Sequence, residues 1–194
     1  MKILHIDSSC GLNPSVSRLA SREVVDRLVQ RTSGTVTYRD IGSNPIPHID
    51  NSYVQAFYAK SDLSAEAIAS GQRSERLIQE LFDHDILVLG VPMYNFGIPS
   101  TLKAYFDHII RPGFTFRFTD QGSEGLVKNK KCITVASRSG HFPANDGNHQ
   151  DIYIKNVLSF IGIVDQKFEI LEGLFDRAVR QNIINNIAET VEFT

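Results

Sequence analysis

The chain has few cysteines, no long apolar run and no surplus of charge. Two cysteines in 194 residues, Cys10 and Cys132, are too few for a disulfide framework. No apolar run approaches the roughly 20 residues of a membrane-spanning helix, and the segment after Met1 is too short and too polar for a signal peptide. A net charge of −2 gives no electrostatic basis for binding nucleic acid or an acidic membrane. We therefore expect a cytoplasmic protein that binds neither nucleic acid nor a membrane.

Several ligand-binding and catalytic motifs are also missing. The sequence lacks Gly-x-x-x-x-Gly-Lys-[Ser/Thr], which disfavours a nucleoside triphosphate, and Gly-x-Gly-x-x-Gly, which disfavours a tightly held dinucleotide. Without a Gly-x-Ser-x-Gly elbow or an identifiable base, neither Ser9 nor Cys10 is a convincing nucleophile. The spacing of His141 and His149 matches no zinc signature. Among phosphate ligands, a monophosphate remains.

The composition, 42% hydrophobic and 22% charged, is that of an ordinary globular protein, and the length suits one domain over residues 1–194.

Five strands are expected, each paired with a helix. The expected strands cover residues 3–7, 35–39, 86–91, 131–137 and 164–171. The expected helices cover residues 15–30, 64–83 and 99–110, a segment marked by Tyr153 to Ile161, and a final one carrying Val179 to Val191. Residues 42–63 are expected to form a long connection, and residues 114–118 an excursion, with a short hairpin as one form.

Burial patterns predict the order of these strands. The first, third and fourth are short apolar runs, as expected of parallel strands covered on both faces. The second and fifth alternate, with Val36 and Tyr38 on one face of the second, and Val164, Phe168 and Ile170 on one face of the fifth. They therefore belong at the edges. The fold class is α/β, a flavodoxin-like doubly wound parallel sheet of order 2-1-3-4-5, whose ligand crevice lies at the carboxyl ends of strands one and three. The loops after strands one, three and four should meet there.

The first of these loops is rich in serine. Ser9, Ser15 and Ser17 bring hydroxyl groups to the start of a helix, where backbone N–H groups and the helix dipole favour an anion. A phosphate would suit this site. The alternative is that Ser15 only caps the helix and the other serines fill a turn.

The other two loops offer groups suited to a flat ring. Met93, Tyr94, Asn95 and Phe96 supply a sulfur, two aromatic rings and an amide directly after the buried third strand, which makes a bound flavin the first hypothesis. The alternative is an ordinary turn whose aromatic rings belong to the core. The third loop runs from Ser137 to Gly140, where glycine permits close approach of the backbone to a ligand. Within it, Arg138 is equally well explained as a surface charge.

The chain resembles the FMN-dependent NADH:azoreductases, flavodoxin-like enzymes that are also quinone reductases. The most specific match is Pro92-Met-Tyr-Asn-Phe96, followed by Ile98 to Lys103 and Tyr105 to Asp107. Further matches run along the chain at 8–9, 15–17, 44–47, 113–119, 124–126, 137–138 and 160–163, so the resemblance covers essentially the whole sequence.

The resemblance implies three groups of FMN-binding residues. The phosphate would be held by Ser9, Ser15, Val16 and Ser17, and the isoalloxazine ring would be lined by Met93, Tyr94, Asn95 and Phe96. The pyrimidine end would contact Ser137, Arg138, Ser139 and Gly140. This chain has Ser139 where the family usually has the first glycine of a Ser-Arg-Gly-Gly pattern. This difference affects what can be expected of the loop conformation and of the flavin affinity.

The implied activity is a two-step transfer of electrons. NADH or NADPH reduces the flavin at N5 and leaves, and an azo compound or quinone then takes the electrons, without a catalytic acid or base from the protein. Family members are typically homodimers with active sites at the interface, to which residues 114–118 are a candidate contributor. Two alternatives stay open: a flavodoxin-type electron carrier, against which the near-neutral charge argues, and a non-catalytic binding protein.

Overall fold

The central sheet of the protein has five parallel strands. The computed structural model describes residues 1–11, 15–58, 62–142 and 148–190. The strands are β1 (Lys2–Asp7), β2 (Thr35–Asp40), β3 (Ile86–Pro92), β6 (Lys131–Ser137) and β7 (Asp165–Leu171), in the order β2-β1-β3-β6-β7. This confirms the predicted order, because β6 and β7 are the expected fourth and fifth strands.

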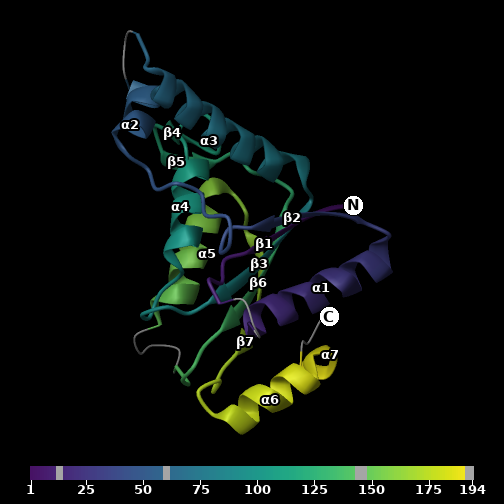
Figure 1. The fold of residues 1–194 in the computed structure, drawn as a ribbon. Helices are drawn as coiled ribbons and strands as arrows, with labels where there is room; N and C mark the ends of the chain where they lie inside the picture. The colour runs from purple at the N-terminus through teal and green to yellow at the C-terminus, as the bar shows by residue number, and fades with distance from the viewer. Residues whose placement is uncertain (12–14, 59–61, 143–147, 191–194) are drawn as a thin grey trace.

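Helices cover both faces of this sheet (Figure 1). One face carries α1 (Val16–Thr32), α6 (Arg177–Asn185) and α7 (Ile187–Thr190), and the other carries α3 (Ala65–Asp83), α4 (Ser100–Ile109) and α5 (His149–Ile161). Successive side chains of a strand point to opposite faces, so Leu87 packs in the α3–α4–α5 core and Val88 packs under α1. None of the helices in the described ranges is long and apolar enough to cross a membrane.

The edge positions of the second and fifth strands are confirmed, but one predicted face is wrong. In β2, Val36 and Tyr38 are 41% and 50% exposed. In β7, Ile170 is 45% exposed while Glu169 is buried, the reverse of the expected alternation. Burial of Glu169 is made possible by Lys167, whose Nζ lies 2.9 Å from its carboxylate.

Two helical predictions need correction. Residues 42–63 are not only a connection, because α2 (Asn51–Tyr58) lies within them. One tertiary contact of this helix is a hydrogen bond in which Tyr53 Oη donates to the carbonyl of Asp107 at 2.8 Å. The final helix is broken at Asn186 into α6 and α7, and Val191 lies outside the described residues. Three apolar side chains of the helices are substantially exposed: Leu19 in α1, and Ile68 and Phe82 in α3.

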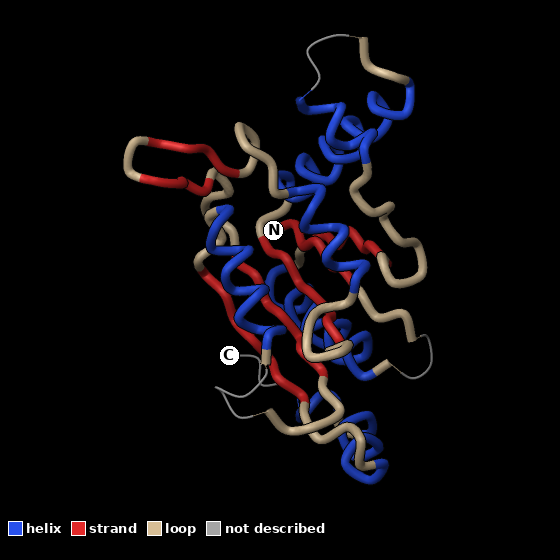
Figure 2. The backbone as a smooth tube through the Cα atoms, turned by 90° about the vertical axis from the view of Figure 1, so that its left-hand side faces the viewer, coloured by secondary structure: helices blue, strands red, loops and turns tan. Residues whose placement is uncertain are grey.

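The excursion after α4 is a hairpin, which was one of the forms expected for residues 114–118. Strands β4 (Phe116–Thr119) and β5 (Gly122–Gly125) pair antiparallel and stand away from the central sheet (Figure 2). The connections that matter for ligand binding leave the opposite, carboxyl ends of the parallel strands.

Candidate functional site

The loops after β1, β3 and β6 meet at one cavity, as predicted. The cavity has a volume of about 260 Å³ and also receives side chains from the segment after β7. Its lining residues are Ser9, Gly11, Ser15, Val16, Pro92, Tyr94, Ser137, Ser139, Leu174 and Arg180. Leu174 and Arg180 were missed by the sequence analysis because no local motif marks them; the parallel register of β6 and β7 brings them here.

The serine loop presents three hydroxyl groups as a cluster. Ser15 occupies the N-cap position of α1, yet its side chain accepts no capping hydrogen bond. Its hydroxyl instead donates to Ser9 Oγ at 3.0 Å and lies 3.2 Å from Ser17 Oγ. The interpretation of Ser15 as only a capping side chain is therefore wrong. The first turn of a helix leaves backbone N–H groups without intrahelical acceptors, Val16 among them, so hydroxyls and amides converge as a phosphate requires.

Two long-range hydrogen bonds hold the serine loop in place. The carbonyl oxygen of Ser9 accepts from Arg18 Nη2 at 2.7 Å. The backbone amide of Cys10 donates to the hydroxyl of Tyr94 at 3.1 Å. The second bond ties the serine loop to the turn after β3, so two walls of the cavity are connected.

The turn after β3 is tight and strained. Tyr94 and Gly97 exchange two backbone hydrogen bonds of 3.0 Å. Between them Asn95 and Phe96 have φ angles of 49° and 69°, and positive φ at both central residues is typical of a type I′ turn. Asparagine tolerates this conformation, whereas phenylalanine is strained in it by roughly 1–2 kcal/mol. The side chains of Tyr94 and Phe96 are 38% and 60% exposed, so the interpretation of these rings as core residues is wrong.

The loop after β6 approaches the same cavity with its backbone. Ser137 accepts a 2.8 Å hydrogen bond from the amide of Met93 through its carbonyl oxygen, which joins this loop to the strained turn. The carbonyls of Ser139 and Gly140 accept from the segment after β7. Within the described ranges, nothing accepts the N–H groups of these two residues, which leaves them available as donors to a ligand. The side chain of Ser139 is exposed.

Arg138 is buried, so the alternative that it is a surface charge is wrong. Its guanidinium donates to Gln150 at 3.1 Å and to Glu172 at 2.8 Å, and it forms an ion pair with Asp151. These partners come from α5 and from the end of β7. Arg138 is not among the residues that line the cavity, and its side chain instead links the loop to these two elements.

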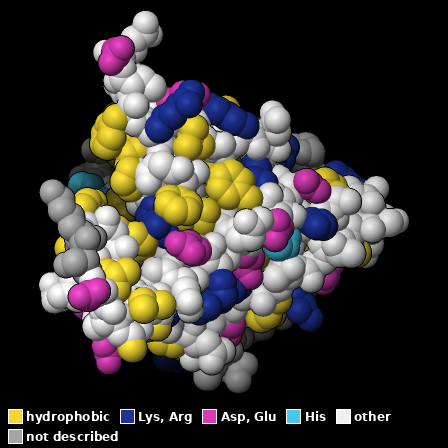
Figure 3. Space-filling model, turned by 90° about the horizontal axis from the view of Figure 1, so that it is seen from above, with side chains coloured by type: hydrophobic (Ala, Val, Ile, Leu, Met, Phe, Trp, Pro, Cys, Tyr) yellow, Lys and Arg dark blue, Asp and Glu magenta, His cyan; other side chains and the backbone are white. Residues whose placement is uncertain are grey.

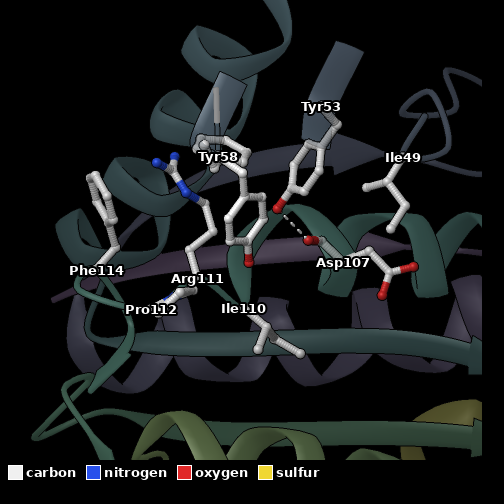
Figure 4. A pocket seen from close by; sticks show the side chains of 9 residues that line it. Ile49, Tyr53, Tyr58, Asp107, Ile110, Arg111, Pro112 and Phe114 are labelled. Carbon is white, nitrogen blue, oxygen red and sulfur yellow. Dashed lines mark hydrogen bonds between the residues drawn. The ribbon is translucent and has the colours of Figure 1, made fainter. Parts of the chain in front are cut away.

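A second cavity, of about 360 Å³, lies at the other end of α4 (Figure 4). In it the guanidinium of Arg111 lies between the rings of Phe57 and Phe114, 3.6 and 3.9 Å from their centroids. Burial lowers the pKa of Arg111 from its ordinary value. The ten residues of α4 span about 15 Å and separate this cavity from the strained turn at the start of the helix.

Comparison with known proteins agrees with the fold. The profile of a family described as having a flavodoxin-like fold matches residues 1–192. An FMN-dependent NADH:quinone oxidoreductase 1 from Idiomarina loihiensis is 41% identical over 177 residues, which are 90% of this chain and 89% of that protein. A second such protein, from Pseudomonas fluorescens, is 39% identical over 89% of this chain and 88% of its own length.

Solved structures show the same architecture at lower identity. An FMN-dependent NADH-azoreductase from Bacillus anthracis, solved with FMN, superimposes with a TM-score of 0.86 at 23% identity over 97% of this chain and 96% of its own. The azoreductase AzrA gives the same score at 22% identity over 98% and 97%. Because the two sequence relatives exceed 35% identity over nearly the whole chain, the chain belongs to the flavodoxin-like family that contains the FMN-dependent NADH:quinone oxidoreductases.

Proposed function

We propose that this protein is an FMN-dependent oxidoreductase that passes electrons from NADH or NADPH to quinones, azo compounds or both. The observation that carries the proposal is the cluster of Ser9, Ser15 and Ser17 hydroxyls, none of which caps the helix. Ser9 and Ser15 line one cavity together with Tyr94 of the turn after β3. The relatives named as FMN-dependent NADH:quinone oxidoreductases support the same activity.

Each wall of the cavity has a role in this proposal. The three serine hydroxyls and the amide of Val16 bind the phosphate of FMN. Met93, Tyr94, Asn95 and Phe96 line the isoalloxazine ring. The backbone N–H groups of Ser139 and Gly140, next to Ser137, donate to its pyrimidine edge. Arg138 acts through the position of that loop. FMN, when bound, supplies the two-electron chemistry, while the protein orients it and sets its electrostatic surroundings.

The shape of the acceptor follows from an exposed aromatic wall. The isoalloxazine ring, bordered by the exposed side chains of Tyr94 and Phe96, offers a flat apolar surface to an electron acceptor. Such a surface suits planar acceptors better than branched or strongly hydrated ones. This supports quinones and azo compounds as the substrate class. An enzyme of this kind works where reduced nicotinamide is available, so we place it in the cytoplasm.

We further propose that the working form is a homodimer with its active sites at the interface. Support comes from apolar side chains near α2 and the β4–β5 hairpin, where Tyr58 is 70% and Phe118 is 76% exposed. Figure 3, a view from above, shows hydrophobic side chains gathered on that side of the molecule. Exposed aromatic residues of this kind are typical of interface anchors.

A visible spectrum tests the proposal directly. The purified protein should be yellow, or become so with added FMN, and should bleach when NADH or NADPH is added without oxygen and recover its colour with a quinone. A yellow protein that neither nicotinamide bleaches would favour an electron carrier. A colourless protein that takes up no FMN would rule out both activities. Sedimentation analysis of the same sample tests the dimer.

A further inference from the structure

A polar cluster lies beside the serine loop, and none of its residues lines the cavity. At its centre is Arg18, in the first turn of α1, whose Nη1 and Nη2 donate to the two carboxylate oxygens of Asp40 at 2.8 and 2.7 Å. The side chains of this pair are 15% and 19% exposed. Nη2 also donates to the carbonyl oxygen of Ser9 at 2.7 Å. One guanidinium therefore joins the end of β2 to the loop that carries the first serine.

Two neighbouring groups restrain this guanidinium further. Arg18 Nη1 donates to the hydroxyl of Tyr38 at 3.1 Å, and that hydroxyl donates to Asp7 Oδ2 at 3.0 Å. Burial raises the pKa of Tyr38 to about 12, so its proton stays on the hydroxyl at neutral pH. Asp7 is itself buried at the end of β1. The planar fork of Arg18 is thereby held in one orientation.

The same Ser9 carbonyl is crowded by a second element. A Cβ placed on Gly42, just after β2, would lie 2.0 Å from that oxygen, which is far inside van der Waals contact. Only glycine leaves the room that the Ser9 carbonyl occupies. The Ser9 carbonyl oxygen is therefore positioned in two separate ways, by the hydrogen bond from Arg18 and by the close approach of Gly42.

We infer that Arg18, held by Asp40, is a positioning residue for the phosphate of the cofactor. It fixes the Ser9 carbonyl, and through it the Ser9 hydroxyl that meets Ser15 at 3.0 Å. The inference rests on the proposed function, because it concerns how the serine cluster receives FMN. Nη1 and Nη2 of Arg18 already donate to protein acceptors. Nε has no partner among the described residues, but it is buried and Arg18 does not line the cavity. We therefore assign its contribution to the geometry of the loop.

The test compares FMN with riboflavin, which lacks only the phosphate. Apoprotein is titrated with each flavin by fluorescence quenching, for the wild type and for Arg18→Gln, Arg18→Lys and Gly42→Ala. The matched control is Arg39→Gln, which breaks another two-point Arg–carboxylate pair, to Glu80 at 2.7 and 2.8 Å, away from the serine loop. Circular dichroism confirms that each variant is folded; if Gly42→Ala is not, the two Arg18 variants suffice.

We expect the wild type to bind FMN more tightly than riboflavin. All three loop variants should reduce this preference by about tenfold or more, since a misplaced charge-assisted hydrogen bond costs roughly 1.5–3 kcal/mol. Their riboflavin affinity should stay close to that of the wild type, and Arg39→Gln should change neither value. If Arg18→Lys also loses the preference for FMN, the planar two-point donor geometry of the guanidinium, and not its positive charge alone, is required.

Two results would overturn the inference in distinguishable ways. If the wild type prefers FMN and Arg18→Gln or Arg18→Lys keeps that preference, the positioning role is wrong while the proposed function stands. If the wild type binds neither flavin, the proposed function fails, and the inference fails with it.

Discussion

The hydroxyl of Tyr94 accepts a 3.1 Å hydrogen bond from the backbone amide of Cys10, a residue 84 positions earlier in the chain. This bond connects the turn after β3 with the serine loop after β1. Tyr94→Phe keeps the ring and removes the acceptor, so we expect FMN affinity to fall about two- to tenfold, in line with roughly 0.5–1.5 kcal/mol for one hydrogen bond. Fluorescence titration of apoprotein measures the change. The control Tyr58→Phe alters an exposed phenol in the other cavity and should have no effect; equal losses in both would contradict the link.

Ser15 and Ser64 both precede helices, but they should respond differently to substitution by alanine. Ser64 accepts a capping hydrogen bond from the amide of Ala67 at 3.2 Å, whereas Ser15 accepts none. Ser64→Ala should therefore lower the free energy of unfolding by about 1 kcal/mol and leave FMN affinity unchanged. Ser15→Ala should weaken FMN about tenfold and cost the apoprotein little stability. Urea unfolding and flavin titration of both variants decide the point, and the reverse pattern would refute the phosphate role of Ser15.

Phe96 is held at a φ of 69° with an exposed side chain, so its replacement by glycine should not destabilise the apoprotein. Relief of the left-handed conformation offsets the loss of the ring, and we expect a change between zero and about 1 kcal/mol in favour of folding. FMN affinity should nevertheless fall, because one wall of the ring site is gone. Asn129→Gly, at a φ of 58° just before β6, is the control and should leave flavin binding unchanged. Unfolding and titration curves for both variants provide the test. Unchanged FMN affinity in Phe96→Gly would show that the Phe96 ring does not line the isoalloxazine site.

The Arg18 guanidinium lowers the pKa of Asp40 to about 2 through its hydrogen bonds. Because this pKa lies below the roughly 3.9 of an unfolded aspartate, ionised Asp40 stabilises the fold above about pH 4. That contribution should be lost as the pH falls from about 4 towards about 2. Urea midpoints across this range should fall more steeply for the wild type than for Asp40→Asn. The exposed carboxylate variant Asp165→Asn is the control and should follow the wild type.

Arg138 should matter more for stability than an exposed arginine does. Its removal in Arg138→Ala leaves Asp151 and Glu172 without their buried cation, which typically costs about 3–5 kcal/mol. Arg117→Ala breaks an exposed pair with Glu124 and should cost about 0–1 kcal/mol. Guanidinium unfolding measures both values. Similar losses would show that the Arg138 network does not support the loop after β6.

Parts of the fold were predictable where burial leaves a mark on the residues themselves. The apolar run of β3 and the alternating run of β2 indicated inner and edge strands, and from these the sheet order followed. The α2 helix was missed because it is short and is held by Tyr53 against α4, a contact that no local pattern records. The face of β7 was misjudged because the pairing of Lys167 with Glu169 allows a charged residue to be buried.

The sequence by itself determined the layered α/β fold, the loops that would meet and the residue types in them, because hydrophobic periodicity and motif spacing are local properties. Only the tertiary structure decided where the side chain of each of those residues lies and which partners it has. Ser15 proved to join a hydroxyl cluster and not to cap its helix, and Arg138 proved to be buried, because both outcomes depend on partners from distant segments. Arg18 and Gly42 meet at the Ser9 carbonyl for the same reason: parallel strands bring loops that are remote in sequence to one end of the sheet.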